Sequence, residues 1–219
     1  MRFRDRSDAG RRLAAALGAY AGQRPVVLAL PRGGVIVAAE VAAALSAAID
    51  VVLVRKIGAP QQPELAMGAV VDGERPITVR NDDVIGMTGA TETEFREIRD
   101  REITEIGRRR ERYLGSRPHA DVTGRTVILV DDGIATGATV RAALQATRRR
   151  RPRKLVLAVP VAPPDVLDGL RGEADDIVCL EALEGSAVAM TYDDFAEVSD
   201  AAVIEILARF PDAGAGPHS

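Results

Sequence analysis

Two adjacent acids, Asp131 and Asp132, follow a short run of β-branched and aliphatic residues in the stretch TVILVDDGIATGATVRAAL, residues 126–144. Neighbouring carboxylates at the end of a buried strand repel each other, so they need a ligand that offsets their charge. The vicinal hydroxyls of a ribose can donate hydrogen bonds to such carboxylates, and a magnesium ion would reduce the repulsion further. Both acids are therefore candidate sugar and metal ligands, and Asp132 is also a candidate catalytic residue.

The loop that follows the acids has the composition of a phosphate site. Its small residues let backbone N–H groups approach a ligand, its threonines supply hydroxyls, and a helix is expected to begin near its end. It lacks the lysine of a Walker A loop and the three-glycine spacing of a dinucleotide fingerprint. A ribose 5-phosphate would satisfy both the acids and this loop. The candidate phosphate-binding residues are Gly133, Ile134, Ala135, Thr136, Gly137, Ala138 and Thr139.

A second anion site is predicted at LPRGG, residues 30–34. Arg32 and the N–H groups of Gly33 and Gly34 stand between an expected strand and an expected helix, where they can surround an anion at the helix N-terminus. Arg55 and Lys56 end another apolar run, and long basic side chains there reach either solvent or a bound anion.

Alternating strands and helices position these residues. Short, nearly continuous apolar runs predict buried strands at 25–31, 49–56, 126–132 and 154–161, with a weaker one at 176–182. Helices are expected at 7–21, with Ser7 as N-cap, at 35–47 and at 138–149. This order favours an α/β fold with a parallel sheet, whose ligands bind beyond the carboxyl ends of the strands.

Residues 57–115 interrupt the alternation. The stretch 57–86 predicts a mobile loop that leads into a β-hairpin, with strands AMGAVV and PITV joined by DGER. A charged helix over 91–114 follows, and its drier side carries Phe95, Ile98, Ile103, Ile106 and Leu114. We expect one domain over 1–210, with a core at about 22–56 and 120–182, an insertion at about 57–115 and a disordered tail at 211–219.

The apolar strand, the two acids and GIATGAT resemble the signature of the type I phosphoribosyltransferases, which bind 5-phosphoribosyl 1-pyrophosphate. The resemblance implies a Rossmann-like parallel-sheet core flanked by helices, a flexible loop or hairpin and a small hood. It makes 30–34 the pyrophosphate loop, where a non-proline cis peptide is often found. It makes Arg55 and Lys56 pyrophosphate contacts before a catalytic loop, with Lys56 as a catalytic residue and Glu64 as an acid or base.

The resemblance also implies a hood over the acceptor, made from the N-terminus and about 183–200. Tyr192 and Phe195 are the candidate acceptor contacts, and Phe3 can close the same side. The reaction it implies is magnesium-dependent transfer of a phosphoribosyl group to a nitrogen acceptor. In the hypoxanthine and guanine enzymes the position of Ala135 is an acid, so a 6-oxopurine acceptor loses support, and the chain looks more like bacterial phosphoribosyltransferase-like proteins without an assigned acceptor.

Two alternatives to a transferase stay open. The same fold serves as a nucleotide-binding regulator, and the basic cluster RRRRPRK at 148–154 would then contact RNA or DNA. A hydrolase acting on a phosphoribosyl substrate is the other alternative. The oligomeric state is open as well, with a homodimer as one candidate.

The composition restricts the remaining classes. The 219 residues are 47% hydrophobic, enough for a full core. The single Cys179 excludes an internal disulfide framework, and His119 and His218 are too few for a zinc site. The net charge of -3 provides no global basic field, which makes nucleic acid a disfavoured partner. We expect neither a signal peptide nor a membrane span, and hence a cytoplasmic protein.

Overall fold

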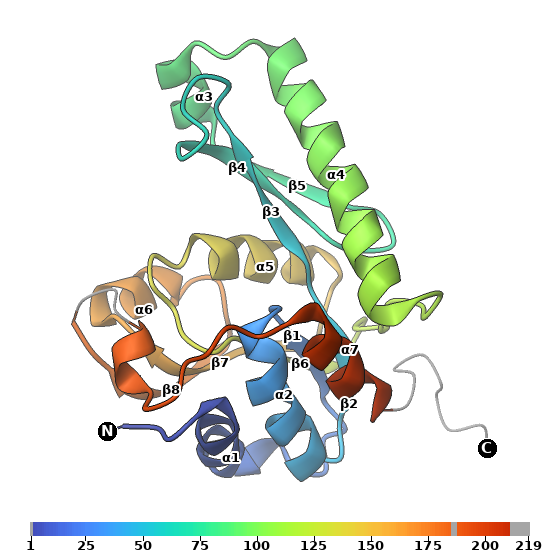
Figure 1. Ribbon diagram of the computed structural model, residues 1–219, viewed down its shortest axis with the longest axis vertical. Helices are drawn as coiled ribbons and strands as arrows, with labels where there is room; N and C mark the ends of the chain where they lie inside the picture. The colour runs from blue at the N-terminus through green and yellow to red at the C-terminus, as the bar shows by residue number, and fades with distance from the viewer. Residues whose placement is uncertain (1, 185–187, 211–219) are drawn as a thin grey trace.

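The computed structural model describes residues 2–184 and 188–210, and Figure 1 shows its two parts, a core and a protruding arm. The predicted tail at 211–219 and residues 185–187 of the predicted hood lie outside the described residues. The core is a five-stranded parallel sheet in the order β2-β1-β6-β7-β8, which confirms the predicted fold class. Its strands are β1 (Val26–Ala29), β2 (Ala48–Val51), β6 (Thr126–Val130), β7 (Lys154–Ala162) and β8 (Asp176–Ala182).

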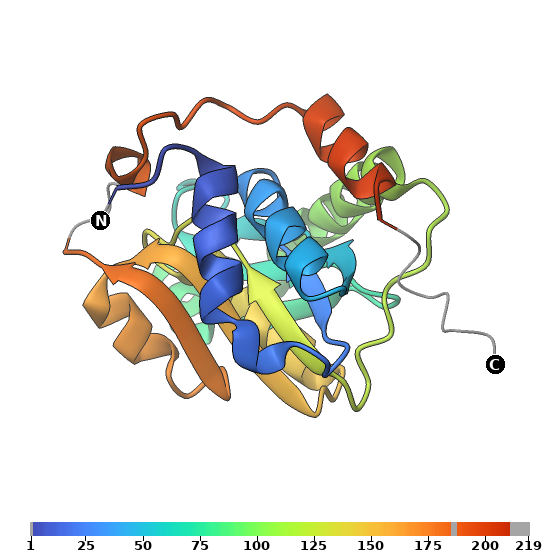
Figure 2. The same cartoon turned by 90° about the horizontal axis from the view of Figure 1, so that it is seen from below.

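Helices cover both faces of this sheet. On one face lie α1 (Arg6–Ala16) and α2 (Gly33–Ala44), which Figure 2 shows side by side over the strands. The opposite face is covered by α5 (Ala138–Arg149) and α6 (Pro164–Leu170). Alternate residues of one strand enter different cores, since Val27 packs beneath α1 and α2 whereas Val26 packs beneath α5. This two-sided burial explains why the strands are apolar without alternation.

The arm comprises residues 54–114. Its antiparallel sheet has the order β3-β4-β5, with β3 (Val54–Gly58), β4 (Ala66–Val71) and β5 (Ile77–Arg80), so the predicted hairpin is confirmed and gains a third strand. The helices α3 (Asp82–Thr88) and α4 (Glu92–Leu114) complete the arm, and α4 begins with a capping box between Thr91 and Glu94. Phe95 and Ile106 of α4 are buried, as predicted.

A buried ion-pair cluster joins the arm to the core. Arg110 of α4 donates from Nη1 to Asp72 at 2.8 Å and from Nη2 to Asp50 of β2 at 3.2 Å. His119 lies 3.0 Å from Asp72, and the Ala120 N–H donates to Asp50 at 2.8 Å. Both carboxylates are at most 5% exposed, so the guanidinium supplies the charge that their burial requires.

Several sequence predictions were wrong at their boundaries, among them the helix expected at 35–47, which spans Gly33–Ala44. The run at 49–56 is not one strand, because the chain leaves the core sheet after Val51 and begins β3 of the arm at Val54. Ser7 is not the N-cap of the first helix. The Asp5 side chain accepts the hydrogen bond from the Asp8 N–H instead, and a short 3-10 helix, η1 (Gly18–Tyr20), follows α1.

The hood joins the N-terminal segment to residues 188–192. Phe3 and Tyr192 form an isolated parallel bridge, and the Phe3 N–H donates to the Thr191 carbonyl at 2.9 Å. The 3-10 helix η2 (Val188–Thr191) precedes this contact, and α7 (Asp200–Ala208) follows it. Residues 192–199 run between them, and in Figure 2 they pass over the ends of α1 and α2.

Candidate functional site

The predicted pyrophosphate loop and the acid pair lie side by side because β1 and β6 are neighbouring parallel strands. Ala29 is paired with Val130, and the Leu30 N–H donates to the Val130 carbonyl at 2.9 Å. The carboxyl ends of both strands therefore deliver their loops to the same edge of the sheet, where α/β proteins bind ligands. The sequence predicted each loop separately, and the topology brings them together.

Glycines at 33 and 34 permit this close approach. A Cβ added at Gly33 would lie 1.8 Å from Oδ2 of Asp132, and one at Gly34 would lie 3.0 Å from Cα of Asp131. The space that two side chains would fill is thus occupied by the acid pair itself. Any larger residue at Gly33 has to displace the Asp132 carboxylate.

The pyrophosphate loop contains the cis peptide bond, between Pro31 and Arg32, that the resemblance implies. The helix α2 begins directly after it, at Gly33, so N–H groups of the first turn are available to an anion. The Arg32 guanidinium turns toward the segment before α7, where Nη2 lies 2.5 Å from Oε1 of Glu197 and Nη1 lies 4.0 Å from Asp200. Arg32 thus already binds carboxylates.

The acid pair is electrostatically asymmetric. Exclusion of water raises the pKa of Asp131 well above its usual value, and the neighbouring charge of Asp132 raises it further. Asp132 instead has a cation beside it, since its Oδ2 accepts from Nε of Arg6 at 2.6 Å. The Tyr192 hydroxyl donates to the Asp132 carbonyl at 2.5 Å, and burial raises the pKa of that hydroxyl. The hood therefore contacts the acid pair through a charge and a hydrogen bond.

The predicted phosphate loop divides into two parts. Ile134 is 2% exposed and its N–H donates to the Val161 carbonyl at 2.9 Å, so its side chain and N–H are occupied within the fold. Gly137 adopts a left-handed φ of 77°, which favours glycine, and α5 begins at the next residue. Thr136 and Thr139 line an open cleft of about 650 Å³ between α5 and the arm.

The basic residues of β3 point in different directions. Lys56 lines the same cleft as Thr136 and Thr139, which places it opposite the phosphate loop. Arg55 instead pairs with Glu102 of α4 at 2.6 Å, so its guanidinium lies against the arm helix. Glu64 is 98% exposed at its side chain and pairs with Lys56 at 3.0 Å. A catalytic role for Lys56 or Glu64, and a substrate contact by Arg55, stay predictions.

The two predicted acceptor contacts pack within the hood. The Tyr192 ring lies 5.3 Å from Phe3 and 4.9 Å from Phe195 between centroids. The Arg6 guanidinium covers the Phe195 ring, with Cζ 3.8 Å from its centroid. Acceptor binding by these rings stays a prediction, and their present contacts are with the hood and the acid pair.

Arg6 and Glu197 are the site residues that sequence reasoning missed. Arg6 lies 126 positions before the acid that it contacts, and Glu197 lies 165 positions after Arg32. Both belong to the charged N-terminal and hood segments, where a single sequence does not distinguish a buried partner from a solvated surface residue. Only the fold, by closing the hood on the strand ends, reveals their positions.

Comparison with known proteins identifies the family. The protein-family model described as the phosphoribosyl transferase domain matches residues 4–194, which include both loops and most of the hood. The chain belongs to the phosphoribosyl transferase domain family. Its affiliation agrees with the resemblance carried by the acid pair and its loop.

Relatives in this family extend over the whole chain. A Mycobacterium tuberculosis protein provisionally named a phosphoribosyl transferase is 45% identical over 218 residues, which cover 97% of this chain and 49% of that protein. This chain thus spans about half the length of that curated relative. The crystal structure of the protein TT1426 from Thermus thermophilus has a TM-score of 0.83 at 44% identity, and the match covers 96% of this chain and 99% of that one. It extends through the arm, so the arm is shared by both proteins.

Bifunctional protein PyrR of Brevibacillus brevis is 56% identical over 48 residues, covering 22% of this chain and 27% of that protein.

The two carboxylates of the acid pair are the candidate metal ligands of this site. Within residues 2–184 and 188–210, no cluster of three or more His, Cys, Asp or Glu side chains is placed to hold a metal ion. The acid pair supplies carboxylate oxygens alone, which fits magnesium, since that ion binds through one or two carboxylates plus substrate phosphates and water. Among the same residues, no helix combines the length and the apolar character that a membrane span requires.

Proposed function

We propose that the chain transfers the 5-phosphoribosyl group of 5-phosphoribosyl 1-pyrophosphate to a nitrogen acceptor and releases pyrophosphate. The observation that carries this proposal is the adjacency of the two loops at the ends of β1 and β6, where Gly33 packs against the Asp132 carboxylate. An anion-binding loop beside an acid pair suits a ligand with a pyrophosphate next to sugar hydroxyls. Family membership supports the same reaction class.

Each part of the donor has a proposed binding element. Arg32 and the first turn of α2 would bind the pyrophosphate, and Asp131 and Asp132 would accept the ribose hydroxyls. The loop before α5, with Thr136 and Thr139, would bind the 5-phosphate. Magnesium, if bound at the acid pair, would offset negative charge on the donor.

The reaction is a displacement at the anomeric carbon of the ribose. The bond from this carbon to the pyrophosphate oxygen breaks, the electron pair leaves with pyrophosphate, and the acceptor nitrogen forms the new bond. The chain's own groups orient the donor and stabilise charge on the leaving group, which is the larger part of catalysis in such transfers. No covalent nucleophile is required.

A small cavity beside Ile134 of the phosphate loop is the proposed acceptor site. It measures about 250 Å³ and is lined mainly by apolar side chains, among them Ile134, Val161, Leu183, Val188 and Met190. Glu184 is the one carboxylate among its described lining residues. The size suits a compact, flat acceptor, because ligand sites for larger molecules occupy roughly 300–1,000 Å³. The residue at 135 is Ala, so no carboxylate from the loop assists at the acceptor ring.

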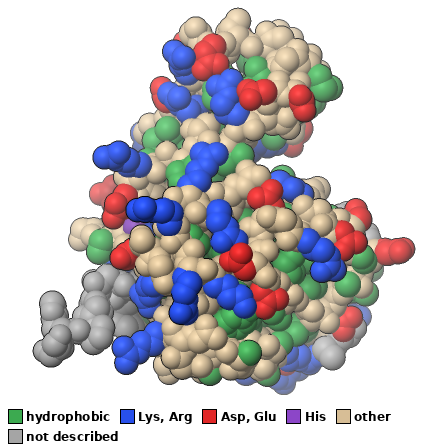
Figure 3. Space-filling view, turned by 180° about the vertical axis from the view of Figure 1, so that it is seen from behind, with side chains coloured by type: hydrophobic (Ala, Val, Ile, Leu, Met, Phe, Trp, Pro, Cys, Tyr) green, Lys and Arg blue, Asp and Glu red, His purple; other side chains and the backbone are tan. Residues whose placement is uncertain are grey.

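The basic cluster at 148–154 supports the regulator alternative poorly. Arg148 pairs with Asp175 at 3.0 Å, Arg150 donates to the Ala120 carbonyl, and Arg153 donates to the Thr126 hydroxyl at 3.1 Å. On the face seen in Figure 3, Lys and Arg side chains are interspersed with acidic ones. We infer that the cluster serves the fold rather than a nucleic-acid partner.

Pyrophosphate release tests the proposal. The protein is incubated with donor and magnesium in the presence of single nucleobases or amines, and the phosphoribosylated product is identified by mass spectrometry. We expect release that depends on one acceptor class. Release without an acceptor, with ribose 5-phosphate as product, would favour the hydrolase alternative. Donor binding with no release for any acceptor would favour a binding protein.

A further inference from the structure

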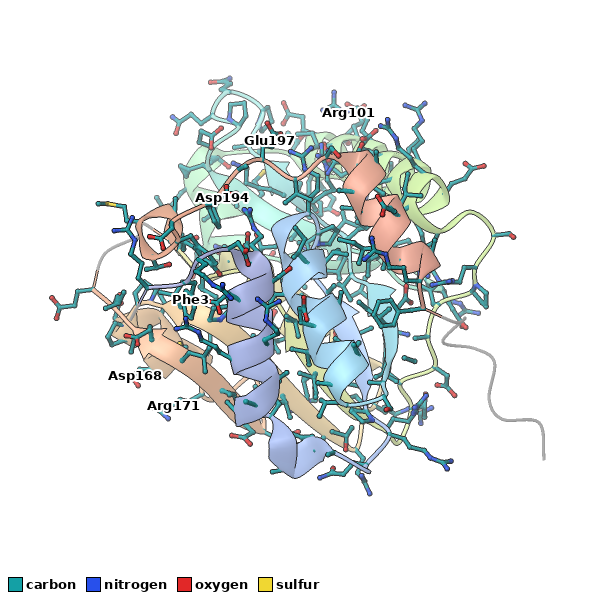
Figure 4. All side chains as sticks on the ribbon, turned by 60° about the horizontal axis from the view of Figure 1, so that its bottom comes forward. Phe3, Arg101, Asp168, Arg171, Asp194 and Glu197 are labelled. Carbon is teal, nitrogen blue, oxygen red and sulfur yellow. The ribbon has the colours of Figure 1, made fainter. Side chains whose placement is uncertain are left out.

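A strap of the hood, residues 192–199, contacts both halves of the proposed donor site. Its backbone is tied to the N-terminal segment, since the Asp193 N–H donates to the Phe3 carbonyl at 2.8 Å and the Asp194 N–H donates to the Arg4 carbonyl at 2.9 Å. Figure 4 shows Asp194 and Glu197 along this strap as it leads to α7. The strap is therefore an ordered part of the hood that reaches the strand ends.

The first contact places a carboxylate on the proposed pyrophosphate ligand. Oε1 of Glu197 lies 2.5 Å from Nη2 of Arg32, and 80% of the Glu197 side chain is exposed. Guanidinium groups bind carboxylates and phosphates through the same donors. The Glu197 carboxylate thus occupies the guanidinium that the pyrophosphate needs.

The second contact places a cation on the proposed ribose ligand. The Arg6 side chain is 9% exposed, its Nε pairs with Asp132 at 2.6 Å, and its Nη1 donates to the Ala196 carbonyl of the strap at 2.8 Å. Its guanidinium also stacks on Phe195 of the strap. The same arginine therefore binds the acid pair and the strap together.

We propose that the strap is a gate that the donor opens by exchanging two ion pairs, with Arg6 and Glu197 as the positioning residues that hold it closed. Glu197 lies on Arg32 where the pyrophosphate would bind, and Arg6 lies on Asp132 where the donor hydroxyls would bind. A ligand with both a pyrophosphate and sugar hydroxyls replaces both partners. An anion alone replaces only one, so the gate favours the complete donor. This inference rests on the proposed function.

The test removes the competing carboxylate and measures the binding of inorganic pyrophosphate by calorimetry. Glu197→Gln keeps the size of the side chain and changes an exposed residue, so the fold is preserved. We expect pyrophosphate to bind about two- to five-fold more tightly, the range that an exposed ion pair contributes. Glu205→Gln is the matched control, because Glu205 of α7 pairs with Arg209, which follows that helix, and the affinity of this variant should equal that of the wild type.

A second measurement follows the strap itself. Hydrogen exchange of peptides covering 192–198 should be faster in ligand-free Glu197→Gln than in the wild type, since one of the two closing pairs is gone. Arg6→Lys keeps the charge at Asp132 and should leave strap exchange closer to wild type than Arg6→Gln does. A purely structural role of Arg6 would disturb both variants alike.

The outcomes separate the gate from the proposed function. Equal or weaker pyrophosphate binding by Glu197→Gln, while the wild type binds pyrophosphate and donor, overturns the gate alone. If the folded wild type binds neither pyrophosphate nor donor, the proposed function is contradicted, and the gate is contradicted with it. Tighter binding with faster strap exchange supports both.

Discussion

The buried cluster around Arg110 gives the sharpest stability prediction. Arg110→Met removes the cation shared by Asp50 and Asp72, whose residues are 1% and 5% exposed. Breaking a buried ion pair from one side costs about 3–5 kcal/mol, because the remaining charge stays buried without its partner. For a chain of this length about 2–4 °C of melting temperature is lost per kcal/mol, so Tm should fall by roughly 6–20 °C.

Thermal unfolding followed by circular dichroism measures this change. Arg109→Met is the control, since Arg109 is the neighbouring residue and pairs with Glu105 on the surface of the same helix, with 46% of its side chain exposed. The control should lose less than about 0.5 kcal/mol. A loss below about 1 kcal/mol for Arg110→Met, or equal losses for both variants, would refute the reasoning that the cluster fastens the arm to the core.

Two further predictions concern the site and the hood. Gly33→Ala should weaken donor binding in calorimetry by about tenfold, since its Cβ would lie 1.8 Å from the Asp132 carboxylate and overpacking costs about 1–3 kcal/mol. The control Gly86→Ala places its Cβ in open space and should bind the donor like the wild type. Equal donor affinity of the two variants would contradict the packing argument. The hydrogen bond from the Tyr113 hydroxyl lowers the pKa of Asp200. This bond therefore stabilises the fold above the usual carboxyl pKa of about 4, and its contribution is lost as the pH falls through the lowered pKa of Asp200. Tyr113→Phe should therefore be less stable than wild type in urea unfolding at about pH 7, and the difference should shrink toward about pH 3; a constant difference would contradict the assignment.

The core elements were predictable because their patterns are local. The strand and loop at 126–139 combine a continuous apolar run, an acid pair and small residues, and each feature is visible within a few positions. The helix over 138–149 begins and ends as predicted. The charged arm helix ends at Leu114 as predicted and begins one residue later than predicted, at Glu92, because Thr91 is its N-cap in a capping box with Glu94.

Other features were not predictable because they depend on contacts between distant segments. The run at 49–56 is apolar over most of its length, so nothing in it marks the point after Val51 where the chain passes from the core sheet to the arm. Arg55 and Lys56 read alike in sequence, yet the alternation of β3 sends one toward α4 and the other toward the phosphate loop. The pairing of Arg6 with Asp132 arises only when the hood closes.

Calorimetry of donor binding in the presence of magnesium tests most directly whether the acid pair and the loops around it bind a phosphoribosyl pyrophosphate donor. The double variant Asp131→Asn with Asp132→Asn should lose donor binding while its melting curve stays cooperative. Asp168→Asn is the matched control, since Asp168 is an exposed acid of α6 that pairs with Arg171, and it should bind like the wild type. Donor affinity in the double variant equal to that of the wild type would contradict the account.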